Sequence, residues 1–233
     1  MKLRRFAIAL LALTGSAIAE TGLLYETDFE QFSIGDNQWA GNEGWFSNSE
    51  ASSTAVQGID DGIVLGLGKS AFLGFNEPAT RWSYVARQLD HDPAAENSSR
   101  IDIDTLLGIQ DSTNGRYDYF FVSIYNISGE FLAPIQFSNE QEAYGIWRDD
   151  GRTLTDTTVD FLTGEVQLLV LHIDPINNRW SAEFDGIPLF TDEIFTQTGK
   201  DITLGSLAYE WQTTDSSRTM SARFYRVTRE VTP

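Results

Sequence analysis

The clearest pattern of hydrophobic and polar positions lies in residues 166–190. It begins with Val166–Ile173, a nearly continuous aliphatic run that predicts a β-strand buried on both faces. The segment Asp174–Arg179 follows, and its proline and asparagines are typical of a tight turn. A second, half-buried strand is then predicted, because apolar side chains recur on one face at Trp180, Ala182 and Phe184. The pair Asp185-Gly186 marks another reversal, so this stretch predicts a hairpin at the centre of the fold.

Similar short runs, separated by turn residues, recur about every 10–15 residues along the rest of the chain. About a dozen short strands, with no convincing helix, linker or internal repeat, predict an all-β domain. We expect an antiparallel β-sandwich of the jelly-roll type. The other predicted strands are Leu23–Glu30, Ile63–Gly68, Ala71–Phe75, Arg81–Leu89, Arg100–Ile109, Tyr117–Asn126, Phe131–Phe137, Ala143–Arg148, Arg152–Phe161, Ile202–Trp211 and Met220–Thr228.

The first nineteen residues have the pattern of a signal peptide. Met1–Arg5 is positively charged, Phe6–Leu13 is apolar but too short to span a bilayer, and Ala17–Ala19 is a small-residue cleavage site. We therefore expect residues 1–19 to be removed near Ala19 and residues 20–233 to form one domain. The chain has no cysteine, which excludes disulfides and a lipid-modified cysteine, and it has no apolar tail. These features predict a secreted or periplasmic protein that is not inserted in a membrane.

Acidic residues dominate the composition, with 34 Asp and Glu against 16 Lys and Arg and a formal net charge of -18. Such a surface repels phosphate backbones and anionic lipids, so nucleic acid is excluded as an expected partner. Anionic polymers such as alginate or pectate are also disfavoured, unless the few arginines cluster. Two explanations of the charge stay open. It is either a solvated surface that favours a monomer, or it includes ligands for calcium.

Three parts of the chain carry a resemblance to a known family. They are Tyr25–Glu30 with Gly44-Trp45, the hairpin Leu168–Phe190, and the closing pair Leu204–Trp211 and Arg223–Val227. In this order they resemble the concanavalin A-like lectin/glucanase superfamily, in the laminin-G-like form of exported bacterial proteins. The resemblance implies a concanavalin A-like jelly roll of two curved antiparallel sheets. It also implies polysaccharide or glycan as the partner, because members of the superfamily mostly bind or cleave polysaccharides.

Catalytic motifs are missing from this sequence. A laminarinase-type site needs Glu-x-Asp-x-x-Glu on one strand, whereas Glu183 and Asp185 are followed by Pro188 in place of the third acid. A lyase needs a base, and the chain has only His91 and His172. Of these, His172 is expected to be a satisfied histidine of a sheet. Neither a Gly-x-Ser-x-Gly motif nor a cysteine nucleophile is present. We therefore expect no catalysis, although Arg81, Tyr84 and Arg87 share one predicted strand and leave an unrecognised active site open.

Aromatic side chains are the candidates for glycan binding, because their faces stack on pyranose rings. The predicted ligand-binding residues are Trp39, Trp45, Trp147 and Arg148, with burial in the core as the alternative for each tryptophan. The predicted calcium ligands are Asp28, Glu30, Asp60 and Asp61, which could equally be ordinary turn residues.

The sequence thus predicts an exported, non-catalytic carbohydrate-binding or adhesion module. The alternatives are a polysaccharide-degrading enzyme with an unrecognised active site and a structural envelope or matrix protein. An enzyme should bring together titratable groups with shifted pKa values in a cleft, a lectin should have aromatic platforms in a shallow cleft, and a structural protein should have neither.

Overall fold

A computed structural model describes residues 20–47, 56–63, 68–74, 82–109, 118–140, 143–213 and 219–231. The predicted signal peptide, residues 1–19, and Arg81 lie outside these described residues. The described residues form sixteen β-strands, and no helix occurs among them that could cross a membrane.

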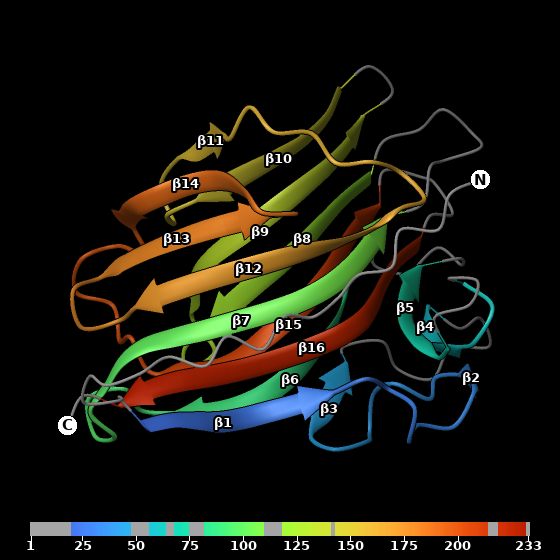
Figure 1. The fold of residues 1–233 in the computed structure, drawn as a ribbon, viewed down its shortest axis with the longest axis horizontal. Coiled ribbons are helices and arrows are strands. Elements are labelled where there is room, and N and C mark those ends of the chain that lie inside the picture. The colour runs from blue at the N-terminus through green and yellow to red at the C-terminus, as the bar shows by residue number, and fades with distance from the viewer. Residues whose placement is uncertain are drawn as a thin grey trace, which may run out of the picture.

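The strands form two antiparallel sheets that face each other, as the sequence predicts (Figure 1). One sheet has nine strands. In order across this sheet they are β14 (Ile187–Ile194), β13 (Arg179–Phe184), β12 (Val166–Asp174), β7 (Ser98–Ile109), β16 (Thr219–Val231), β5 (Ser70–Gly74), β4 (Gln57–Asp60) and β2 (Gly35–Asp36), with β1 (Glu20–Thr27) paired to β16.

The other sheet has seven strands and carries the aromatic centre of the sequence. Its order is β11 (Leu154–Asp156), β10 (Ala143–Asp149), β9 (Phe131–Glu140), β8 (Asp118–Tyr125), β15 (Leu204–Thr213), β6 (Trp82–His91) and β3 (Trp45–Ser47). Strands β6 and β15 therefore lie side by side although about 120 residues separate them in the chain. This long-range pairing creates the faces described below.

The hairpin at residues 166–190 forms as predicted, with β12 paired to β13 and β13 paired to β14. The first turn places Asn178 at φ 55°, and the second places Asp185 and Gly186 at φ 53° and 76°. In the second turn both central residues therefore have positive φ. This is the geometry of a type I′ turn, whose twist matches that of the flanking strands. The local turn chemistry therefore determines the register of this part of the sheet.

One prediction about the hairpin is wrong. Burial alternates along β12, so this strand is buried on one face only. Leu169, Leu171 and Ile173 are fully buried between the sheets, while Val170 and His172 on the other face are partly exposed. The outer face of the nine-stranded sheet is open to solvent, and the aliphatic residues there shield the sheet without belonging to the core. The predicted apolar face of β13 is confirmed, because Trp180, Ala182 and Phe184 are all buried.

The predicted polar strand Arg152–Phe161 is much shorter in the structure. The strand β11 pairs through its three residues with the end of β10, and beyond it Thr157 and Val159 form backbone hydrogen bonds with Ile146 of β10. An edge strand this short has no hydrophobic alternation of its own to reveal it. Pro134 of β9 pairs with Ser123 of β8, while the pairing of β9 with β10 extends only as far as Ile135, so the proline lies just beyond the end of that ladder.

The core between the two sheets includes polar links as well as aliphatic packing. Tyr209 of the seven-stranded sheet and Thr105 of the nine-stranded sheet are both fully buried, and their hydroxyl groups are 2.7 Å apart in a hydrogen bond. This hydrogen bond satisfies two buried hydroxyl groups and links the two sheets across the core.

Candidate functional site

The outer face of the seven-stranded sheet is rich in aromatic side chains. On β6, β8 and β15 the residues Val85, Val122 and Tyr209 point into the core and are fully buried. Side chains alternate in direction along a strand, so the residues between them must face outward. The outward set comprises Trp82, Tyr84 and Ala86 on β6, Phe121, Ser123 and Tyr125 on β8, and Ser206, Ala208 and Glu210 on β15.

Part of this face is an aromatic hollow with a volume of about 200 Å³. It is lined by Phe46, Trp82, Tyr84, Ala86, Tyr125, Gly129, Ser206 and Ala208. The Trp82 ring stacks on Phe121 with their centroids 5.4 Å apart and an interplanar angle of 26°. Trp82 and Phe46 are nevertheless 36% and 41% exposed. A large ring that is held by a neighbour and still open to solvent can stack on the apolar face of a sugar.

A buried carboxyl contacts residues that line the aromatic hollow. Glu210 is 1% exposed, and the Tyr125 hydroxyl donates a hydrogen bond of 2.7 Å to its Oε1 atom. Burial raises the pKa of Glu210, while the polar groups of Tyr125, Ser123 and Trp82 act in the opposite direction. Burial also raises the pKa of Tyr125, and the negative charge of Glu210 adds to the shift. Tyr125 lines the hollow and Glu210 does not, so a ligand there would meet the phenol and not the carboxyl.

A second, acidic hollow of about 310 Å³ lies on the same sheet across β8, β9, β10 and β11. It is lined by Tyr119, Gln136, Ser138, Gly145, Trp147, Leu154, Asp156, Thr158 and Asp160. In the sheet, Phe121 is paired with Gln136 on one side and Glu210 on the other, so this ring lies between the two hollows. The predicted ligand residue Trp147 is thus on a wall of a hollow, where its ring is partly exposed.

The prediction that Trp39 and Trp45 bind ligand is corrected by their burial. The two side chains are only 1% and 2% exposed, and their ring centroids lie 5.2 Å apart. Both also pack against Tyr209 in the core. The polar residues around them in the sequence favoured an exposed loop, but Trp45 begins strand β3, and both rings are buried in the core. Trp45 borders a hollow of about 360 Å³ with Phe46 and Gln57, but its side chain, like that of Trp39, is almost fully buried.

Arg148 is also separated from Trp147, because adjacent residues of a strand face opposite ways. Its guanidinium forms an ion pair of 3.3 Å with Glu193 of β14 and lies 5.5 Å from the centre of the Phe190 ring. These contacts link the edges of the two sheets. They hold Arg148 away from the acidic hollow, so it is not placed to bind a ligand together with Trp147.

The predicted calcium ligands do not come together. Oxygens of Asp28 and Asp60 accept hydrogen bonds from backbone N–H groups two residues further on, as in ordinary turns. Glu30 accepts a hydrogen bond from the Lys69 backbone. Within the described part of the chain, no three acidic, histidine or cysteine side chains, Asp61 included, are grouped to hold a metal ion.

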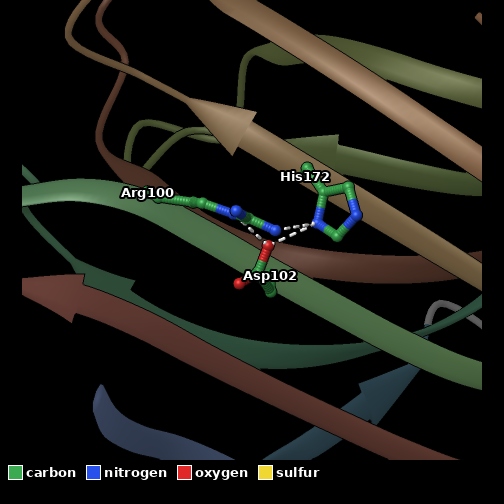
Figure 2. Close-up of polar contacts among 3 residues, drawn as sticks. All are labelled: Arg100, Asp102 and His172. Carbon is green, nitrogen blue, oxygen red and sulfur yellow. Dashed lines mark hydrogen bonds and ion pairs between the residues drawn. The ribbon is translucent and has the colours of Figure 1, made fainter. Parts of the chain in front are cut away.

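The outer face of the nine-stranded sheet holds a polar cluster (Figure 2). Asp102 Oδ1 is 2.5 Å from His172 Nδ1 and accepts a 2.7 Å hydrogen bond from Arg100 Nε. Arg100 also places a terminal nitrogen 2.7 Å from the same Nδ1. A protonated Nδ1 donates to Asp102, whereas an unprotonated one accepts from Arg100, so it satisfies one partner at a time. The cluster borders a hollow of about 270 Å³ that also includes Arg179 and Asp192.

This cluster gives a prediction about stability in acid. Burial acts to raise the pKa of Asp102, but hydrogen bonds from His172 and Arg100 outweigh it and lower the pKa below its ordinary 3.8. A lowered pKa stabilises the fold above pH 3.8, and this stabilisation is lost as the pH falls through the folded-state value. We expect Asp102→Asn to lower the free energy of unfolding by about 1–2 kcal/mol at pH 7 and by progressively less below pH 4. Urea unfolding from pH 7 to 2.5 measures this. The control Asp192→Asn, at an exposed acid of the same hollow, should change the free energy of unfolding little. If the stability loss of Asp102→Asn is as large at pH 2.5 as at pH 7, Asp102 does not have a lowered pKa.

Comparison with known proteins identifies the fold. No protein-family model matches the sequence, and no curated protein matches it. Among solved structures, it is similar to a conserved carbohydrate esterase from the Shiga toxin-encoding bacteriophage phi24B, with a TM-score of 0.61, 11% identity and coverage of 91% of this chain and 100% of that one. It is similar to an endo-1,3-beta-glucanase from Streptomyces sioyaensis (TM-score 0.56, 12% identity, 94% and 100% covered) and to peanut lectin (0.54, 12%, 92% and 100%). It also matches a sialidase at a TM-score of 0.57 and 8% identity, but spans only 18% of that chain.

The fold is a concanavalin A-like jelly roll, as the resemblance in the sequence implies. The similar structures include both enzymes and a lectin, so the fold alone does not assign an activity. The sequence predicted Trp147 as a ligand-binding residue, but it did not predict that Trp82, Tyr125 and Glu210 come together. The available signal was the alternation on residues 82–86, which places Trp82 and Tyr84 on one face.

Proposed function

We infer that this chain is a non-catalytic glycan-binding module that uses the outer face of the seven-stranded sheet. The observation that carries this proposal is the aromatic hollow, where Trp82 is held in place by Phe121 yet is 36% exposed. An exposed aromatic surface costs free energy in water, and stacking on the C–H face of a sugar recovers it. We place this module outside the cytoplasm, as a monomer, on the basis of the leader-like residues 1–19 and the acidic composition.

The arrangement of carboxyl groups supports binding over hydrolysis. A retaining glycosidase needs two carboxyls about 5–5.5 Å apart, both reaching the scissile bond. Among the described residues that line the aromatic hollow, none is Asp or Glu, and the nearby Glu210 is only 1% exposed. The acid pair of the acidic hollow, Asp156 and Asp160, lies beyond Phe121. A single sugar ring stacked on Trp82 would therefore lack a reachable acid and nucleophile.

A binding and turnover screen on residues 20–233 tests this proposal. Neutral polysaccharides (laminarin, xylan, galactomannan, arabinan) and anionic ones (alginate, polygalacturonate) are titrated with calcium and with chelator, while reducing and unsaturated ends are assayed. We expect saturable binding without new ends, and about tenfold weaker binding in Trp82→Ala, because one stacking contact is worth about 1–1.5 kcal/mol. Ile176→Ala is the control, since this exposed residue lies in a turn of the other sheet.

Two outcomes would overturn the proposal. New reducing or unsaturated ends would show an enzyme, and the carboxyls of the acidic hollow would then be examined first. Binding to none of the polysaccharides would favour a structural protein of the cell envelope or matrix.

A further inference from the structure

The deepest ionisable group on the proposed binding face is Glu210, and glycan stacking on Trp82 gives it no task. A carboxyl that is 1% exposed is unfavourable to bury in its charged form unless hydrogen bonds compensate for the lost hydration. Replacing it with an apolar residue would shield the sheet at lower cost. Two of its three polar partners, Tyr125 and Trp82, line the aromatic hollow, which points to a role in what the hollow presents to a ligand.

The hydrogen bond between Tyr125 and Glu210 has a fixed direction when the carboxyl is ionised. A carboxylate has no hydrogen to give, so the phenol must donate its only hydrogen across the 2.7 Å contact. The Tyr125 oxygen then has only lone pairs left, and the Tyr125 residue is part of the lining of the hollow. It can accept a hydrogen bond from a ligand but cannot donate one.

We propose that Glu210 is a positioning residue that makes the Tyr125 oxygen an obligate hydrogen-bond acceptor, so that the aromatic hollow selects neutral glycans through a sugar hydroxyl donor. The inference rests on the proposed function and assigns the ligand class of the same site. Glu210 acts through Tyr125 and does not itself touch the ligand.

The charge of the two hollows supports selection of neutral glycans. Among the described residues that line them there is no Lys, Arg or His, and the charged side chains are Asp156 and Asp160. A uronate or sulfated sugar would bring a negative charge next to these acids and above Glu210, with no cation to pair it. A sugar hydroxyl carries no charge and supplies the hydrogen that Tyr125 requires.

The surroundings of Glu210 make the effect dependent on pH. It is paired in register with Tyr84 on β6 and Phe121 on β8, and the polar groups near its carboxyl are Tyr125, Ser123 and Trp82. No cationic side chain is among these neighbours. Burial raises the pKa of Glu210, so its protonated form persists to a higher pH than that of an exposed glutamate. A protonated Glu210 can itself donate to Tyr125, which frees the phenol hydrogen and removes the selection. Glycan affinity should therefore increase as the pH rises through the pKa of Glu210.

Calorimetric titration with laminarin, xylan, galactomannan and arabinan from pH 4 to 9 tests the inference. We expect wild-type affinity to rise by about five- to tenfold with pH, about the worth of one hydrogen bond. Glu210→Gln has nearly the same shape and both donor and acceptor atoms, as the protonated acid does. It should bind at every pH with the affinity that the wild type has at pH 4. Glu183→Gln, on the other sheet, should keep the wild-type profile.

Two further measurements separate positioning from a merely structural role. The first is the double variant Glu210→Gln with Tyr125→Phe. Because the glutamine introduced by Glu210→Gln is uncharged, removing the Tyr125 hydroxyl does not leave a buried charge without a hydrogen-bond donor. The double variant should bind glycan more weakly than Glu210→Gln alone but unfold at a similar urea concentration. Alginate and polygalacturonate should not compete for the site.

The inference is overturned, with the proposed function intact, by a pH-independent wild type, by a titrating Glu210→Gln variant, or by anionic polymers that bind as tightly as neutral ones. A wild type that binds no polysaccharide at any pH overturns both.

Discussion

Replacing Gly205 by alanine is expected to lower the free energy of unfolding by about 3 kcal/mol, because a side chain there would collide with backbone atoms. An added Cβ would lie 2.2 Å from the carbonyl oxygen of Asn126 and 2.6 Å from the Cα of Ile127. Backbone atoms of a packed turn cannot swing aside as the end of a long side chain can. Strand β15 would have to move away from the turn that follows β8.

The same close approach matters for the proposed site. Gly205 directly precedes Ser206, which is paired with Tyr125 and shares the aromatic hollow with it. Displacing β15 at this point would also move Glu210 relative to Tyr125. We therefore expect Gly205→Ala to weaken glycan binding as well as the fold.

Urea unfolding measured by tryptophan fluorescence checks the expected loss, with Gly62→Ala as the matched control. Among the described residues, an added Cβ at Gly62 would meet only the end of the Asp60 side chain, at 3.2 Å, so a change within about 1 kcal/mol is expected there. Equal midpoints for the two variants would show that the turn after β8 yields, and that β15 does not depend on this contact.

The parts of the fold that were predictable are those set by local sequence. The alternation at Trp180, Ala182 and Phe184 identified a buried face, and Asp185-Gly186 identified a two-residue turn, because both signals lie within a few neighbouring residues. The run in β12 misled because aliphatic residues such as Val170 occur on a solvent-facing side as well. Composition alone does not tell a covered sheet from an open one.

The candidate site was harder to predict because strand register brings it together. Glu210 and Tyr125 are 85 positions apart and meet through the pairing of β15 with β8, which no local pattern encodes. The opposite error occurred at Trp39 and Trp45. Their polar, glycine-containing surroundings favoured a loop, but Trp45 begins the short strand β3, and both large rings are buried in the core.

Removing Trp82 and Trp147 together is expected to weaken binding of a long neutral polysaccharide by about a hundredfold, which corresponds to about 2.7 kcal/mol. The two rings line different hollows of one sheet, with Phe121 between them, and only a chain of several sugars could touch both. Contacts that are distant and share no partner contribute additively, so each single alanine variant should cost about tenfold.

Ligand length provides the decisive comparison for this prediction. For a short oligosaccharide that fills one hollow, the double variant should bind no more weakly than the more affected single variant. For the polysaccharide, the two effects should multiply. Calorimetric titration of the wild type, both single variants and the double variant with laminarin and with a laminarin disaccharide measures this. If Trp147→Ala leaves polysaccharide binding unchanged, the ligand is confined to the aromatic hollow, and Trp147 is a wall of a hollow that the glycan does not enter.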